Sequence, residues 1–249
     1  MTRLQRAMLP ARVVLVAAWI VVVVGACAGR TAPAGEFVEI PGVGETRADV
    51  PRPSTRPGAD CEPALPDGEP VNARAAALRG IGFFADRSHL SDDELGAEIE
   101  TTIRQEWGID VDPSDPFLEL LVAGQDEQRI WWRDLEADVG PGGDVYVSTI
   151  REWAAISVGA FAPESIEEDW ASAEGPITVT VTAHGKLLVL EPEYLEDWID
   201  PRIATPINEL IAPSGRQFTF FQAFDQTAFV VALTDSERVA LEDRGWCFE

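Results

Sequence analysis

The sequence predicts an α+β domain in which two β-hairpins and a C-terminal strand form an antiparallel or mixed sheet with helices packed on it. Apolar and polar residues alternate strictly over "ITVTVT", residues 177–182, which is typical of a strand with one buried face. Two further strand-like runs follow downstream, "QFTFF" from Gln217 and "AFVVAL" from Ala228. Helical patterns lie between these pairs, and this grouping is typical of the α+β class.

Turn residues place the two hairpins. The first is expected to pair residues 177–182 with "KLLVLE", residues 186–191, through the short Ala-His-Gly connection at 183–185. The second is expected to turn near residues 224–226. The apolar and aromatic run "GWCF", residues 245–248, predicts a strand that closes the chain.

Capping signals and helical periodicity predict the helices. Ser91 and Glu94 form a capping box, and Gly108 supplies a stop. Between them, apolar residues recur every four positions at Leu95, Ile99, Ile103 and Trp107. Thr234 and Glu237 form a second capping box before a short helix. Further helices are expected over residues 116–123, 144–158, 163–171 and 200–211, the last beginning with Asp200 as N-cap and Pro201 as its first residue.

Tryptophan positions add an expectation about the core. Trp107, Trp153 and Trp170 lie on the apolar stripes of predicted helices, so we expect all three to be buried. Trp131 and Trp132 are adjacent, and neighbouring residues of a strand face opposite ways. One of that pair is therefore expected to point outward, although the apolar patterning favours a core-filling role for both.

The N-terminus has the layout of an export signal. Arg3, Arg6 and Arg12 precede an uncharged stretch, residues 13–28, that is shorter than the roughly 20 residues needed to cross a bilayer. The stretch closes with "VGAC", residues 24–27, which resembles the lipobox of bacterial lipoproteins. That resemblance implies that Cys27 carries a diacylglycerol and becomes the first residue after residues 1–26 are removed. A plain signal peptide or a short uncleaved anchor is the alternative reading.

Composition then divides the rest of the chain. Residues 27–72 are rich in proline and glycine, which predicts an extended tether, and residues 73–249 have the composition of a single globular domain. With Cys27 assigned to lipid, Cys61 and Cys247 remain, and two cysteines in an exported chain predict one structural disulfide.

Charge limits the partners. The chain carries a formal net charge of −24, which opposes binding to nucleic acid. Attachment to the extracytoplasmic face of the cell membrane through the N-terminal lipid is expected, together with a protein or another envelope component as partner.

No motif indicates catalysis or a cofactor. His89 and His184 belong to no metal-binding spacing, and the chain contains no nucleophile elbow or phosphate-binding loop. Asp134, Glu136, Asp138 and Asp144 are candidate ligands for a divalent cation because they alternate before a glycine-rich turn. They do not match an EF-hand, since Val139 and Val145 occupy positions where that loop needs glycine and glutamate.

Three functions are consistent with these patterns. A non-catalytic binding or interaction module at the membrane fits best, because neither catalytic motifs nor a cofactor signature accompany the anchor and tether. An envelope hydrolase that uses paired carboxylates is one alternative. A divalent-cation module centred on the four acidic candidates is the other.

Overall fold

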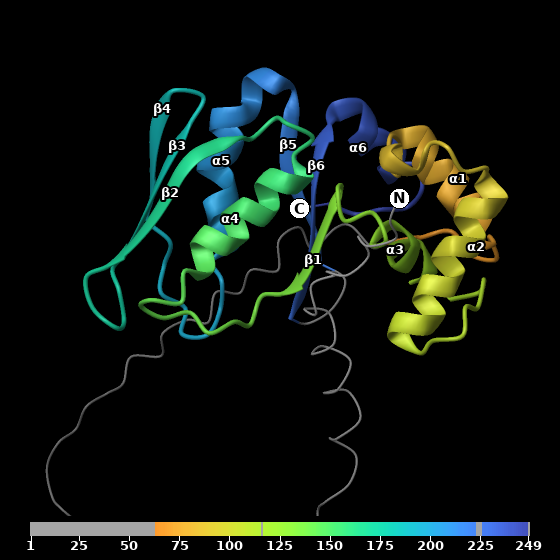
Figure 1. The fold of residues 1–249 in the computed structure, drawn as a ribbon, viewed down its shortest axis with the longest axis horizontal. Coiled ribbons are helices and arrows are strands. Elements are labelled where there is room, and N and C mark those ends of the chain that lie inside the picture. Colours follow the sequence, from red (N-terminus) through yellow and green to blue (C-terminus); the bar gives the residue numbers. More distant parts are fainter. Residues whose placement is uncertain (1–62, 116, 223–225, 249) are drawn as a thin grey trace, which may run out of the picture. The chain divides into compact units, whose positions relative to one another are not determined.

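The computed structural model describes residues 63–115, 117–222 and 226–248. All of them belong to one structural unit, residues 56–249. They form successive layers: an outer sheet, a pair of helices, a central sheet and a group of helices (Figure 1). The predicted α+β class and both predicted hairpins are confirmed, but each hairpin belongs to its own three-stranded antiparallel sheet.

Both sheets have simple orders. The central sheet runs β1-β6-β5, with β1 at Ile130–Asp134, β5 at Arg216–Gln222 and β6 at Thr227–Thr234. The outer sheet runs β2-β3-β4, with β2 at Pro163–Trp170, β3 at Ile177–Ala183 and β4 at Lys186–Leu190. The α-helices of the described part are α1 (Val71–Ile81), α2 (Asp92–Thr102), α3 (Leu118–Ala123), α4 (Val145–Ile156), α5 (Ala204–Ile211) and α6 (Asp235–Glu242). Shorter helical turns lie at Ala85–Arg87, Ile103–Trp107, Pro201–Ile203 and Ala212–Ser214.

Side chains of the central sheet alternate between two hydrophobic cores. On β6, Val230 belongs to the first core, which lies between the two sheets, and Val231 belongs to the second core, which lies under α1, α2 and α3. Six consecutive residues of β6 are buried because both faces of the strand are covered. Trp131 and Trp132 divide in the same way, so the more exposed of the pair still packs against the second core.

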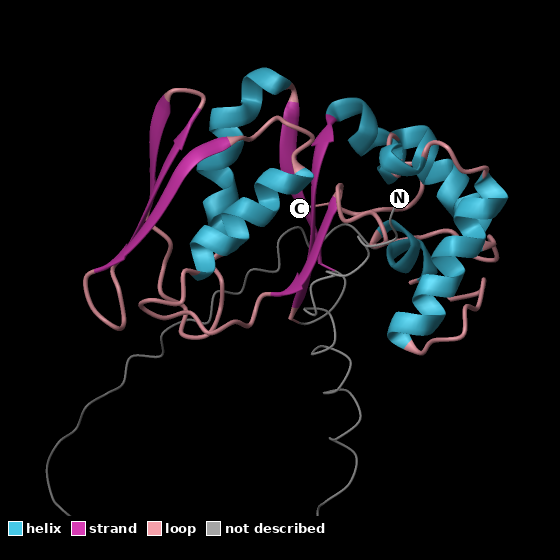
Figure 2. Cartoon of the chain, viewed as in Figure 1, coloured by secondary structure: helices cyan, strands magenta, loops and turns pink. Residues whose placement is uncertain are grey.

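Two helices fill the space between the sheets (Figure 2). α4 contacts β2 on one side and β1 and β6 on the other, and α5 contacts both β4 and β5. Asp144 precedes α4 but does not cap it with its side chain. The carboxylate of Glu168, on β2, instead accepts hydrogen bonds from the backbone N–H groups of Tyr146 and Val147 at 3.0 and 3.3 Å. This contact fixes the outer sheet to the start of α4.

The helix predicted over residues 163–171 is wrong, because this segment is strand β2. Ile166 and Trp170 are four residues apart, and a spacing of four places two side chains on one face of a helix and also on one face of a strand. In the structure β2 pairs along its length with β3, and both residues face the first core. Pairing with the alternating strand β3 therefore decides the conformation, which the spacing alone did not.

The closing strand predicted over residues 245–248 is also wrong. The backbone N–H of Trp246 donates to the carbonyl of Leu241 at 3.0 Å, so this segment terminates α6 instead of joining a sheet. The Trp246 side chain is buried in the second core. The run 245–248 is apolar because its side chains pack into the second core beside α6.

The tryptophan expectations hold in part. Trp153 is fully buried, as predicted, whereas Trp170 is half-buried on β2. Trp107 is 41% exposed and stacks on Trp132 with ring centroids 4.8 Å apart. It lies at the end of Ile103–Trp107, a π-helical turn. Because a π-turn holds more residues than an α-turn, it rotates Trp107 away from the apolar stripe that the α-helical period predicts.

Residues before α1 already contact the folded unit. The N–H of Ala64 donates to the carbonyl of Gly245 at 3.0 Å, and Glu69 forms an ion pair with Arg244 at 3.0 Å. Segment 63–72, which the composition assigns to the tether, is thus packed against the C-terminal residues. Among the described residues, no helix is long and apolar enough to span a membrane.

Helices α1 and α2 approach closely at Gly96. A Cβ atom on Gly96 would lie 2.6 Å from Cα of Asn72, whereas a Cβ on Gly80, also in a helix, would meet no atom within 4 Å. We expect Gly96→Ala to lower the free energy of unfolding by about 1–3 kcal/mol because the helices must separate. Gly80→Ala should raise it by about 0.5–1 kcal/mol by restricting the unfolded chain. Chemical denaturation of the two variants checks this, and equal effects would contradict the packing argument.

Candidate functional site

The outer sheet has an open edge at β4. Among the described residues, β4 pairs with β3 alone. Its hairpin turns at His184 and Gly185, whose φ angles of 54° and 69° are those of a type I′ turn. In such a turn the N–H of Lys186 bonds to Ala183, so the alternate residues Leu187 and Val189 direct their backbone polar groups away from β3.

The same register exposes two apolar side chains. Leu190 is buried in the first core and Leu188 packs against it, whereas Leu187 is 68% exposed and Val189 52% exposed. An open strand edge with apolar side chains is a template for pairing with another chain. The sequence predicted strand 186–191 but not this exposure, because "KLLVLE" is apolar at four consecutive positions and shows no alternation.

Exposure continues to alternate past the end of β4. Glu191 and Glu193 are exposed, and Pro192 between them is buried. The open row of β4, by which we mean Leu187, Val189, Glu191 and Glu193, therefore has an apolar half and an acidic half.

A surface cavity of about 450 Å³ lies at the acidic end of this row. Its lining includes Val189, Leu190, Glu191, Glu193, Asp200 and Arg202. Arg202 donates from Nε to Asp200 Oδ1 at 2.8 Å and from Nη2 to Glu193 Oε2 at 2.5 Å. Hydrogen bonds to these two carboxylates raise the pKa of the Arg202 guanidinium above its usual value.

Asp200 is the buried centre of this cluster. Its carboxylate also accepts from the N–H groups of Glu193 and Arg202, and its own N–H donates to the Tyr146 hydroxyl at 3.1 Å. The predicted role of Asp200 as a cap is confirmed, since the N–H of Arg202 bonds to its side chain in the turn before α5. Burial raises the pKa of Tyr146 to about 12, so this phenol is protonated at neutral pH. These hydrogen bonds connect the lining of the cavity to Tyr146 on α4.

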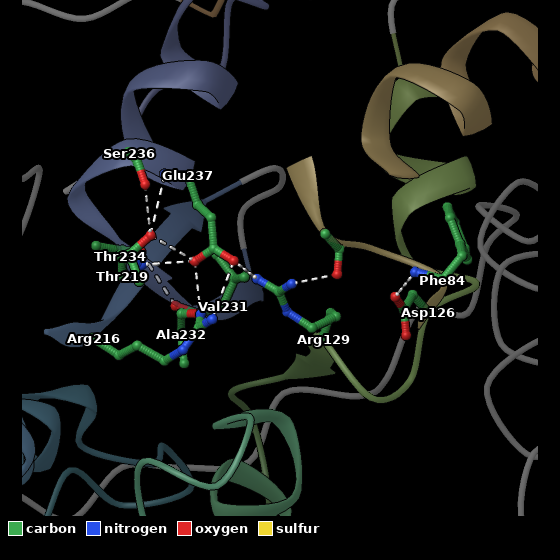
Figure 3. A network of polar contacts seen from close by, with 11 residues as sticks. Phe84, Asp126, Arg129, Arg216, Thr219, Val231, Ala232, Thr234, Ser236 and Glu237 are labelled. Carbon is green, nitrogen blue, oxygen red and sulfur yellow. Dashed lines mark hydrogen bonds and ion pairs between the residues drawn. The ribbon is translucent and has the colours of Figure 1, made fainter. Parts of the chain in front are cut away.

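Two other polar clusters are structural. In the first, Glu237 accepts hydrogen bonds from Arg216 and from Arg129, with nitrogen–oxygen distances of 2.7 and 3.2 Å (Figure 3). Arg129 also donates to the carbonyl of Gly82 at 2.6 Å. Burial opposes ionisation of Glu237, but the N–H of Thr234 and the two arginines outweigh it, so the pKa of Glu237 is lowered.

The second cluster lies beside α1 and α3. Glu119 and Arg74 are completely buried, and Nη1 of Arg74 lies 3.5 Å from Oε2 of Glu119. Arg244 binds Glu119 through two hydrogen bonds of 2.8 and 2.9 Å. Because Arg74 also donates to the carbonyls of Glu69 and Pro113, this network ties the two ends of the described chain to its centre.

The structure does not bring the four acidic candidates together into one group. All four are exposed, and no group of three His, Cys, Asp or Glu residues in the described part of the chain is placed to hold a metal ion. The Asp134 carboxylate accepts from the N–H of Glu136 at 2.9 Å, and Glu136 accepts from the Gln226 amide. Asp138 and Asp144 lie further along the loop before α4. The carboxylates of Asp134 and Glu136, which the sequence suggested as cation ligands, thus serve as hydrogen-bond acceptors.

The cysteines and histidines complete the predicted residues. Cys27 and Cys61 lie outside the described residues, while Cys247 packs against the second core. Ala64 follows Cys61 by three positions and bonds to Gly245, which favours the predicted pairing of Cys61 with Cys247. His184 lies in the hairpin turn with its Nε2 3.0 Å from the carbonyl oxygen of Ala160, and His89 is exposed in a turn.

Comparison with known proteins adds no relative. No protein-family model matches the chain, and neither a curated protein nor a solved structure matches it. The β4 edge and its adjoining cavity are therefore the features from which a function is inferred.

Proposed function

We propose that the protein is a membrane-anchored lipoprotein whose folded domain binds a partner protein along the open edge of β4. The observation that carries this proposal is the pair of exposed side chains, Leu187 and Val189, beside backbone groups that face away from β3. A partner segment that adds a strand here gains main-chain hydrogen bonds and buries both side chains.

The cavity supports the same surface. It shares Val189 with the edge and extends it toward Arg202, so a bound segment that continues past β4 reaches a concave, charged site. Main-chain pairing supplies affinity in this kind of recognition, and pockets for individual side chains supply specificity. The β4 edge would thus supply main-chain pairing, and the adjoining cavity would supply a pocket for a side chain.

Anchoring is tested separately from binding. Cys27→Ala is expected to abolish incorporation of a labelled fatty acid and to release the protein from the membrane fraction, because two acyl chains are needed for stable attachment. Ser54→Ala, a change in the predicted tether, serves as the control and should leave the labelling unchanged. Retention of label in Cys27→Ala would contradict the lipoprotein assignment.

Binding at β4 is tested by site-specific photo-crosslinking of the full chain in the cells that produce it. A photoreactive residue at Val189 is expected to join the protein to a discrete partner, and the same residue at Val239 is not. Val239 is the matched control because it is an apolar residue on α6 with an exposure of 54%, close to the 52% of Val189.

A second variant separates edge pairing from simple apolar contact. With the photoreactive residue at Leu187, the change Val189→Pro removes an N–H that faces away from β3 and leaves the pairing with β3 intact. It should abolish the crosslink without loss of the folded state, measured by thermal unfolding. Equal crosslinking at Val189 and Val239, or crosslinking unaffected by the proline, would contradict the proposal.

A further inference from the structure

The open row of β4 contains one carboxylate that the protein does not neutralise. Glu193 is paired with Arg202 through a 2.5 Å contact between Oε2 and Nη2. Glu191, two positions earlier, forms no ion pair among the described residues. A strand that pairs with β4 would place its side chains beside Leu187, Val189 and Glu191 in turn, since alternate residues share one face.

The surroundings of the row are also acidic. On the outer face, β3 presents threonines at 178, 180 and 182, and β2 beyond it presents Glu167 and Asp169 opposite two of them. The only lysine of the chain is Lys186, at the start of β4 and on the face opposite to Leu187. With a formal net charge of −24, the chain attracts a basic segment to this edge and repels an acidic one.

We propose that the occupant of the β4 edge is an extended basic segment of a partner protein, with a lysine or arginine beside Glu191 and apolar side chains beside Val189 and Leu187. This inference rests on the proposed function and names the chemistry of the partner. Antiparallel pairing is the more stable arrangement per residue. In that arrangement the partner segment contains, from its N-terminal end, a basic residue, any residue, an apolar residue, any residue and a second apolar residue.

A second copy of the chain fits the edge less well. If two copies paired antiparallel along the whole of β4, two-fold symmetry would place Leu188 opposite itself and Leu187 opposite Val189. This pairing would cover the apolar half of the open row of β4. It would also place Glu191 opposite Gly185 of the other copy, and the neighbouring Lys186 lies on the other face of the strand. Two chains of net charge −24 would meet at that seam, and the carboxylates at its ends would stay unpaired.

The test measures binding of two labelled peptides to the full chain in detergent solution. The probe peptides are TKTVTVT and TETVTVT, which differ only at the position that antiparallel pairing places beside Glu191. The lysine peptide is expected to bind about fivefold more tightly than the glutamate peptide at low salt. Raising the salt concentration should shrink that ratio, since exposed charges are screened.

Variants of the protein assign the preference to one residue. Glu191→Lys should reverse the order of the two peptides. Glu209→Lys, an exposed position on α5, makes the same change in net charge and should leave the order unchanged. Val189→Pro should abolish binding of both peptides if the contact is made through the strand edge.

The outcomes distinguish this inference from the proposed function. Equal affinity for both peptides, or a preference that Glu209→Lys reverses as well, would overturn the basic partner while the crosslink at Val189 still supports edge binding. A crosslink at Val189 that joins two copies, or that returns to the same chain, would overturn it in favour of self-association. Charge reversal at Glu191 alone supports it.

Discussion

Glu119→Gln is expected to lower the free energy of unfolding by about 3–5 kcal/mol, the range for breaking a buried ion pair from one side. Glutamine keeps the size of the side chain but removes its charge. Arg74, which is completely buried, would then face no carboxylate, and Arg244 would keep only Glu69 as a charged acceptor. Urea unfolding of the full chain, followed by tryptophan fluorescence, measures the loss.

An exposed ion pair provides the control for this change. Glu242 and Arg238 are one turn apart on α6, with a nitrogen–oxygen distance of 2.8 Å and side chains 42% and 36% exposed. Glu242→Gln should change the free energy of unfolding by no more than about 0.5 kcal/mol. If Glu119→Gln were as mild as this control, the buried network would not hold the chain ends as the structure implies.

Glu237→Gln is expected to destabilise the protein by about 3 kcal/mol at neutral pH, because Arg216 and Arg129 would lose their common charged acceptor. The effect should depend on pH in a defined direction. Since the pKa of Glu237 is lowered in the folded state, its ionised form stabilises the fold above the unfolded pKa of roughly 4.3, and this contribution is lost as the pH falls through the folded value.

The measurement compares wild type and Glu237→Gln by urea unfolding at neutral pH and at several acidic values. Their difference should be largest at neutral pH and should shrink at the most acidic values, where the wild-type carboxyl is itself protonated. Glu242→Gln again serves as the control and should show little dependence on pH. A difference that grew on acidification would contradict the assigned direction of the pKa shift.

Local signals in the sequence predict much of the fold. Both capping boxes form as expected, at Ser91 with Glu94 and at Thr234 with Glu237, because they depend on residues only three positions apart. β3 is predicted because its threonines alternate with buried residues. Segments whose conformation is set by distant partners are not: β2 becomes a strand through its pairing with β3, and Trp246 is placed by the second core.

Less of the candidate site than of the fold is predicted from the sequence. The sequence predicts the strand that begins at Lys186 and the cap at Asp200, and both are confirmed. It does not show that β4 ends a sheet, since edge position depends on how strands far apart in the chain are ordered. The exposure of Val189 follows from that order and from the turn at His184.

The position of β6 has a consequence for the order in which the protein is made. This strand contributes to both hydrophobic cores, yet it is synthesised after every other strand of the described residues. Until it emerges, Trp131 and Trp132 on β1 have no neighbouring strand, and neither core can close. The nascent chain therefore keeps both hydrophobic cores incomplete through most of its synthesis. Completion of both cores therefore waits for β6.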